Sequence, residues 1–341
     1  MRPEEIEALV ARDHGHVWHP FTPMQQWRER QPVIVERAEG DVLIDVHGKR
    51  YIDGISSLWC NVHGHRVDTL DQAVRDQLER VAHTTMLGLS SVPSSQLAAR
   101  LAKLSPGALN KVFYSDSGAT ATEVAFKMAA GYHFHERGQQ RDLFVGIRGA
   151  YHGDTVGSMS VGYSELFHRP FEKMVFRCEW APVPDVSHAD GWQSVATADG
   201  GRRWALDDVV HRERIRDEAL RGMDELLTRL GGRVAAVVVE PLVQGAAGII
   251  VQPPGYLAGV AELVRKHDTL LIADEVATGF GRTGRMFACE HEQVEPDILC
   301  LGKGITGGYL PLAATLATDR IEQAFCGEIA EHKTLYHGHT Y

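Results

Sequence analysis

Three short apolar runs, each ending beside a charged residue, most constrain the fold of this chain. They are Val234–Val239 before Glu240, residues 270–273 before Asp274, and Ile298–Leu301 before Lys303, with one glycine between. An apolar run of this length predicts a buried strand. The charged residues would then lie at the carboxyl ends of strands, where open α/β sheets gather their binding sites.

Helical and strand-like patterns alternate from about residue 70 to about residue 325. The pattern predicts helices over residues 70–81, 96–104, 121–130 and 215–230, and strands over residues 111–114, Leu143–Ile147 and the three runs above. Such alternation predicts an α/β fold whose mainly parallel sheet carries helices on both faces. Before it, strand-like runs at 32–36 and 41–49 predict part of a smaller domain. The polar, glycine-bearing stretch 182–203 predicts a surface loop.

Lys303 and Asp274 are the residues from which a chemistry can be predicted. A buried or crowded amine loses its proton more easily, and a neutral amine can form a Schiff base. A carboxylate can keep a pyridinium nitrogen protonated, so the two residues together are what pyridoxal phosphate (PLP) needs. The alternatives are a solvated loop lysine at position 303 and a helix cap or metal ligand at position 274.

A cluster of small residues precedes the helix predicted from residue 121. Gly118 and Ala119 lie in Tyr-Ser-Asp-Ser-Gly-Ala-Thr, where small side chains let backbone N–H groups approach an anion such as a phosphate. The alternative is an ordinary helix start, since Thr120 and Glu123 match a capping box. Further along, Tyr151 could stack on a flat cofactor ring, or it could be a packed loop tyrosine.

Two other motifs suggest different chemistry. Residues 279–284 match GxGxxG after a predicted strand, but they do not open an apolar helical period, so the indication of a dinucleotide site is weak. The 18 histidines include the pairs His63/His65 and His337/His339, yet there is no HExxH motif. We therefore expect no metal site and no nicotinamide cofactor.

The composition favours a cytoplasmic enzyme with small-molecule partners. With 341 residues, 44% of them hydrophobic, the chain can bury a large core. A net charge of −10 disfavours nucleic acid as a partner. No apolar stretch approaches the roughly 20 residues of a membrane span, and the N-terminus is too acidic for a signal peptide. The five cysteines lack CxxC pairing, which favours reduced thiols.

Taken in order, these motifs resemble the fold-type I, class III PLP-dependent aminotransferases. The resemblance rests on residues 17–24, 53–57, 151–155, 273–284 and 297–303. The segments at Asp274 and Lys303 are shared by the wider class, and residues 18–21 and 56–59 are the ones that narrow the resemblance. The similarity covers essentially the whole chain. It implies an aminotransferase of biotin biosynthesis that converts 8-amino-7-oxononanoate to 7,8-diaminononanoate. Another class III omega-aminotransferase and a truncated, non-catalytic PLP-binding protein are the alternatives.

The resemblance also implies how the cofactor is held. Lys303 would form the Schiff base with PLP, and Asp274 would pair with its pyridinium nitrogen. Gly118 and Ala119 would contact the phosphate. Thr340 would reach the phosphate of a neighbouring subunit, which implies a homodimer with its sites at the subunit interface.

The remaining implied roles concern the ring and the substrate pocket. Tyr151 would stack on one face of the cofactor ring and take part in catalysis, while Val276 would pack on the other face. Trp59, Tyr151 and Gly338 would border the substrate. Phe21 and Leu58 differ from residues often found in members that use S-adenosyl-L-methionine, so that donor and lysine both stay open.

The resemblance finally implies a domain division. We expect residues 1–65 to be the N-terminal part of a small α+β domain, 66–325 the large PLP-binding domain, and 326–341 the start of a return segment. The family normally continues beyond this point with an arginine for the substrate carboxylate. We therefore expect the chain to be a fragment or a truncated product.

Overall fold

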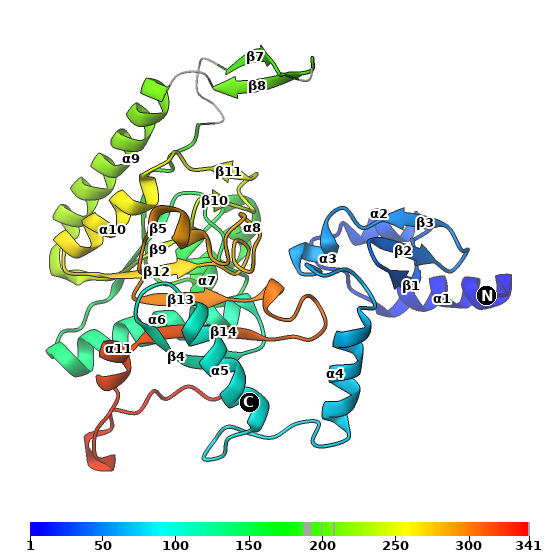
Figure 1. Cartoon of the computed structure of the whole chain (residues 1–341), viewed down its shortest axis with the longest axis horizontal. Coiled ribbons are helices and arrows are strands. Elements are labelled where there is room, and N and C mark those ends of the chain that lie inside the picture. Colours follow the sequence, from blue (N-terminus) through cyan, green and yellow to red (C-terminus); the bar gives the residue numbers. More distant parts are fainter. Residues whose placement is uncertain (187–191, 199, 207–208, 340–341) are drawn as a thin grey trace. The chain divides into compact units, whose positions relative to one another are not determined.

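The computed structural model describes residues 1–186, 192–198, 200–206 and 209–339 (Figure 1). The chain forms two compact units. Unit 1 is Met1–Ala82 with Gly307–Tyr309, and unit 2 is His83–Thr306 with Leu310–Tyr341. The division between the units falls after residue 82, and the domain boundary at residue 65 stays a prediction.

Unit 1 is built around a three-stranded antiparallel sheet in the order β1-β2-β3. Its elements are α1 (Pro3–His16), α2 (Met24–Arg28), β1 (Val35–Glu39), β2 (Val42–Asp45), β3 (Arg50–Ile52), α3 (Ser56–Trp59) and α4 (Asp68–Leu78). Asp45 closes the turn between β2 and β3, because its carboxylate accepts the N–H groups of His47 and Lys49 and the hydroxyl of Tyr51. The helix predicted over residues 70–81 is confirmed as α4, and the strand-like run at 41–49 contains β2, but the run at 32–36 reaches only the first two residues of β1.

A seven-stranded sheet in the order β4-β14-β13-β12-β9-β5-β6 forms the centre of unit 2. Its strands are β4 (Leu109–Ser115), β5 (Leu143–Ile147), β6 (Glu179–Ala181), β9 (Val234–Val239), β12 (Leu270–Asp274), β13 (Ile298–Leu301) and β14 (Ala313–Thr318). The four pairings from β13 to β6 are parallel, whereas β14 is antiparallel to both of its neighbours. Strand β4 therefore runs in the same direction as the other five, and the mainly parallel sheet is confirmed.

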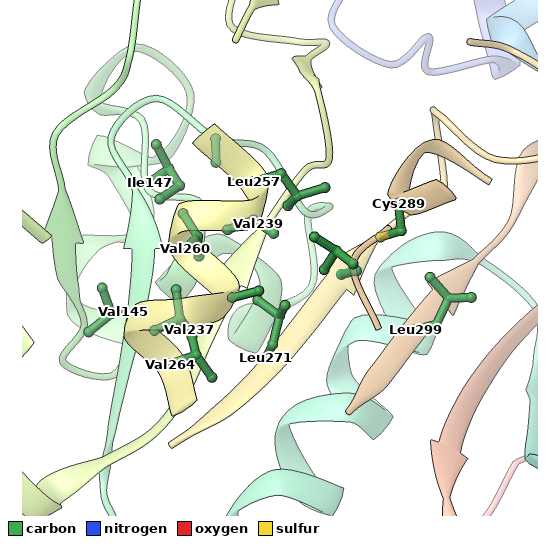
Figure 2. Close-up of a cluster of buried hydrophobic side chains, with 14 of the residues drawn as sticks. Val145, Ile147, Val237, Val239, Leu257, Val260, Val264, Leu271, Cys289 and Leu299 are labelled. Atoms are coloured by element: carbon green, nitrogen blue, oxygen red, sulfur yellow. The ribbon is translucent and has the colours of Figure 1, made fainter. Parts of the chain in front are cut away.

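Helices cover both faces of this sheet, as the sequence predicted. The helices of unit 2 are α5 (Val92–Leu104), α6 (Gly118–Arg137), α7 (Val156–Val161), α8 (Glu165–His168), α9 (Val209–Leu230), α10 (Tyr256–Lys266) and α11 (Asp319–Gln323). One core cluster joins alternate strand residues to α5, α9 and α10, and a second joins the intervening strand residues to α6 and α11. In Figure 2, Leu257, Val260 and Val264 of α10 lie against Val237 and Val239 of β9.

The expectation of a surface loop over residues 182–203 is wrong in part. Within this stretch β7 (Trp192–Ala196) pairs with β8 (Arg202–Leu206) as an antiparallel hairpin, while residues 187–191 and 199 lie outside the described residues. The backbone of Thr197 exchanges hydrogen bonds with Gly200 and Gly201 across the turn. Gly200 and Gly201 therefore belong to the turn of a hairpin.

Short elements complete the described chain. They are the hairpin strands β10 (Val243–Gln244) and β11 (Ile250–Val251), and the 3₁₀ helices η1 (Arg169–Met174), η2 (Gly231–Arg233), η3 (Ala288–Glu292), η4 (Lys303–Ile305) and η5 (Ile329–Glu331). All five cysteines are free thiols. Among the described residues, no helix is both long enough and apolar enough to cross a membrane.

Candidate active site

The predicted site residues of unit 2 follow strands that point in one direction. Asp274 ends β12 and pairs in register with Cys300 of β13, three residues before Lys303. The Glu275 N–H extends this pairing by donating to the Cys300 carbonyl at 2.9 Å. Because the two strands are parallel, Asp274 and Lys303 lie at the same edge of the sheet.

Asp274 is buried, with 4% of its surface exposed, and both carboxylate oxygens accept hydrogen bonds. Oδ1 accepts the Val276 N–H at 3.0 Å, and Oδ2 lies 2.7 Å from Nδ1 of His152. An imidazole N–H donates to a carboxylate, so His152 holds the orientation of Asp274. Sequence reasoning placed His152 in the Tyr151 motif but gave it no role.

The His152 side chain has no exposed surface. Burial by itself would lower the pKa of His152, but the hydrogen bond and negative charge of Asp274, with the charge of Glu240, raise it above the usual value. The pair therefore favours an imidazolium beside a carboxylate. A negative Asp274 at this place can accept a hydrogen bond from a protonated ring nitrogen.

The amino end of α6 carries a capping box, one turn earlier than the sequence alternative placed it. Ser117 Oγ accepts the Thr120 N–H at 3.3 Å, and Thr120 Oγ1 accepts the Ser117 N–H at 3.0 Å. The Thr120/Glu123 box is wrong, because Glu123 instead accepts the Gly157 N–H at 2.6 Å.

Gly118 and Ala119 form the first turn of this 20-residue helix. In the described part of the chain, neither backbone N–H donates a hydrogen bond, and both lie at the positive end of the helix dipole. A Cβ on Gly118 would lie 2.5 Å from Val276 Cγ1, so only glycine lets these two segments pack. The turn has the features of a phosphate cradle.

Val276 connects three of the predicted segments. It follows Asp274, lies against Gly118, and would also be 3.2 Å from a Cβ placed on Gly302, next to Lys303. The segments after β4, β12 and β13 therefore meet, although they are far apart in sequence. This meeting supports the predicted common site for the phosphate, the ring nitrogen and the lysine.

Lys303 is half-buried and begins η4 with a φ of 43°, in the left-handed region. A non-glycine residue rarely occupies this region, and such conformations cluster at functional sites. The following Gly304 is required by packing, because a Cβ there would lie 2.9 Å from Cβ of Phe280. Lys303 is thus held in a strained turn at the sheet edge.

Tyr151 is held at both ends. Its backbone N–H donates to Oε1 of Glu240 at 2.9 Å, and its hydroxyl donates to Oδ2 of Asp154 at 2.8 Å. Burial and the Asp154 carboxylate raise the pKa of the Tyr151 phenol well above its usual value. The phenol therefore stays protonated, and an uncharged ring is suited to stacking.

Glu240 is a second buried acid at the sheet edge, directly after β9. The sequence marked it as the end of an apolar run without assigning it a role. Burial raises the pKa of Glu240 to about 7, against the opposing influence of His152.

Three further predicted site residues are found in other segments of the chain. Trp59 lies in unit 1, at the end of α3. Gly338 is exposed in unit 2, beside His339, whose Nε2 lies 3.3 Å from Oδ1 of Asp116. Thr340 lies outside the described residues. The roles of these three residues stay predictions.

The rival motifs form no second centre in the described residues. Residues 279–284 form turns that lead into η3, and Gly281 and Gly284 have φ of 89° and 91°. No α-helix starts there, as a dinucleotide fingerprint would need. Among residues 1–186, 192–198, 200–206 and 209–339, no group of three or more His, Cys, Asp or Glu side chains could hold a metal ion.

Comparison with known proteins shows the family. The model of class-III aminotransferases matches residues 24–341. An adenosylmethionine-8-amino-7-oxononanoate aminotransferase of Nitratidesulfovibrio vulgaris is 49% identical over 98% of this chain, and one of Geobacter sulfurreducens is 46% identical over 99%. The chain spans 59% and 71% of the lengths of these two relatives.

Solved structures agree with this result. The adenosylmethionine-8-amino-7-oxononanoate aminotransferase of Methanocaldococcus jannaschii is 43% identical with a TM-score of 0.87, covering 98% of this chain and 70% of that one. An (S)-enantioselective omega-transaminase of Thermomicrobium roseum has the same TM-score and coverage at 35% identity. The chain belongs to the class III aminotransferase family. Its cofactor is pyridoxal phosphate, for which the residues at the sheet edge provide a fitting set of groups.

Proposed function

We propose that this protein transfers an amino group to 8-amino-7-oxononanoate, forming 7,8-diaminononanoate for biotin biosynthesis. The observation that best supports this proposal is the 46–49% identity, over 98–99% of the chain, to relatives named for this reaction. The fold does not distinguish this reaction from that of a general omega-transaminase, because the omega-transaminase of T. roseum superposes equally well. The higher identity favours the biotin reaction over a general omega-transaminase.

The chain's own groups have distinct parts in this proposal. When bound, PLP supplies an electron sink for the carbon that carries the amino group. Lys303 Nζ holds the cofactor and, once released, is the base that takes the proton from that carbon. Asp274, oriented by His152, keeps the ring nitrogen protonated. The free N–H groups of Gly118 and Ala119 bind the phosphate.

The remaining assignments support substrate binding and assembly. Tyr151 and Val276 would enclose the cofactor ring, and Trp59 and Gly338 would border the substrate. Thr340 would serve the phosphate of a second subunit in a homodimer. We place the enzyme in the cytoplasm, where its small-molecule substrates would be found.

Half-reactions test the function and the donor together. Purified protein loaded with PLP is mixed separately with S-adenosylmethionine, lysine and alanine, and formation of pyridoxamine phosphate is followed by absorbance. The aminated protein then receives 8-amino-7-oxononanoate, and mass spectrometry detects 7,8-diaminononanoate. We expect product with S-adenosylmethionine or lysine as donor.

Two outcomes oppose the proposal. Turnover of simple ketones without conversion of 8-amino-7-oxononanoate would assign the protein to the omega-transaminases. Cofactor binding with no half-reaction for any donor would indicate a binding protein. If S-adenosylmethionine reacts and lysine does not, the substitutions at Phe21 and Leu58 carry no information on the donor.

A further inference from the structure

We propose that Glu240 is a positioning residue that fixes Tyr151 for stacking on the cofactor by binding two loops at once. The inference rests on the proposed function only in that Tyr151 contacts the cofactor. It concerns a buried acid that performs no step in the reaction above.

The geometry of Glu240 is that of a two-sided clamp. Oε1 accepts the N–H of Tyr151 and Oε2 accepts the N–H of Gly245, each at 2.9 Å. Tyr151 belongs to the loop after β5, whereas Gly245 follows β10. One carboxylate therefore connects two loops whose residues Tyr151 and Gly245 are 94 positions apart in the sequence.

Glu240 is itself held in place. The backbone carbonyl of Glu240 accepts a hydrogen bond from Nε2 of Gln252 at 2.8 Å. Oε1 of Gln252 in turn accepts a hydrogen bond from the Leu242 N–H at 3.1 Å. Only 5% of Glu240 is exposed. A buried carboxylate is costly unless its oxygens are hydrogen-bonded, and bonds to charged acceptors are the strong ones. Loss of the clamp would leave the N–H groups of Tyr151 and Gly245 without these partners.

Tyr151 gains a fixed position from this arrangement. Glu240 holds the backbone at one end of the residue and Asp154 holds the hydroxyl at the other. The contact of an aromatic ring with the cofactor depends on where the ring is held, so a loosened backbone should alter the environment of the bound cofactor. A change in the cofactor's environment would distinguish a residue that positions Tyr151 from one that only stabilises the loops.

The test uses Glu240→Gln with Glu292→Gln as its matched control. Glu292 also accepts two backbone N–H groups, from Gly255 at 2.7 Å and Ala258 at 2.8 Å, but it lies at the start of α10 and touches no proposed site residue. Gln at 240 keeps one acceptor oxygen and turns an NH₂ group toward the other N–H. The same exchange occurs at Glu292, which is half-buried where Glu240 is buried, so the control matches the two hydrogen bonds but not the degree of burial.

Amide hydrogen exchange and the circular dichroism of bound PLP are the readouts. At a pH above the Glu240 pKa of about 7, where the carboxylate is ionised, we expect Glu240→Gln to raise exchange in the peptides that contain Tyr151 and Gly245 on the order of tenfold, as loss of one charge-assisted hydrogen bond implies. The dichroism of bound PLP should weaken, and its dissociation constant should rise several-fold. Glu292→Gln should raise exchange at Gly255 and Ala258 while leaving the cofactor signal unchanged.

Two results would overturn the proposal. One is unchanged protection at both Tyr151 and Gly245, and the other is a cofactor signal that changes equally in both variants. If Glu240→Gln does not fold, Glu240→Asp replaces it, because the shorter carboxylate cannot reach both N–H groups and should show the same changes. None of these readouts needs substrate, so a failure to convert 8-amino-7-oxononanoate leaves this test intact.

Discussion

The central strands of unit 2 differ along their own length. In their middle they are apolar and inaccessible, as at Val238 and Ile272, whereas their carboxyl ends place Glu240 and Asp274 in almost equally buried surroundings. The middle is stabilised by many weak contacts that no single residue dominates. The ends depend on a few directed hydrogen bonds. Substitution should therefore change mainly stability in the middle and mainly chemistry at the ends.

The largest effect is expected for Lys303→Ala. The variant should lose covalent attachment of PLP, and the absence of a base alone should slow turnover by about 10²–10⁴-fold or more. Borohydride reduction followed by peptide mapping measures the attachment. A reduced cofactor found on another lysine would contradict the assignment.

A smaller but still large effect is expected for Asp274→Asn. The amide cannot supply the negative charge beside His152, so the electron sink weakens and turnover should fall by about 10²–10³-fold, as when one electrostatic stabiliser is removed. Single-turnover absorbance measures the rate, and a PLP titration checks that the variant still binds cofactor. A near-normal half-reaction rate would remove Asp274 from this role.

Gly118→Ala tests the packing between the helix start and the sheet edge. The added methyl group would lie 2.5 Å from Val276 Cγ1, and overpacking of this kind costs about 1–3 kcal/mol. We expect PLP affinity to fall by a comparable amount, measured by equilibrium titration. Gly232→Ala is the control, because a Cβ there meets nothing within 4 Å. Equal affinities in the two variants would argue against a cradle at Gly118.

The smallest effect is expected for Ile272→Val, in the middle of the strand that ends at Asp274. Removing one buried methylene should lower the free energy of unfolding by about 0.5–1.5 kcal/mol. Denaturant titration measures this loss, and the half-reaction rate should be unchanged. A marked fall in rate would show that the middle and the end of β12 are not separable as proposed.

Local pattern in the sequence was sufficient for five of the seven strands of the central sheet and for two of the site residues, whereas β6 and β14 were not predicted. Leu143–Ile147, Val234–Val239 and Ile298–Leu301 form β5, β9 and β13 with the predicted bounds. Buried strands require continuous apolar runs, and a charge directly after such a run must lie at the sheet edge. For this reason the apolar runs alone were enough to place Asp274 and Lys303 at that edge.

Only the tertiary structure decided which groups meet at that edge. His152 and Asp274 are 122 residues apart and become partners because the strand order brings β5 and β12 to either side of β9. The same order brings Glu240 within hydrogen-bond distance of the Tyr151 N–H. It also places β14 between β4 and β13, antiparallel to both. The hydrophobic pattern of the sequence indicates only whether each segment is buried. Hydrogen-bond partners depend on strand order, which no local pattern encodes.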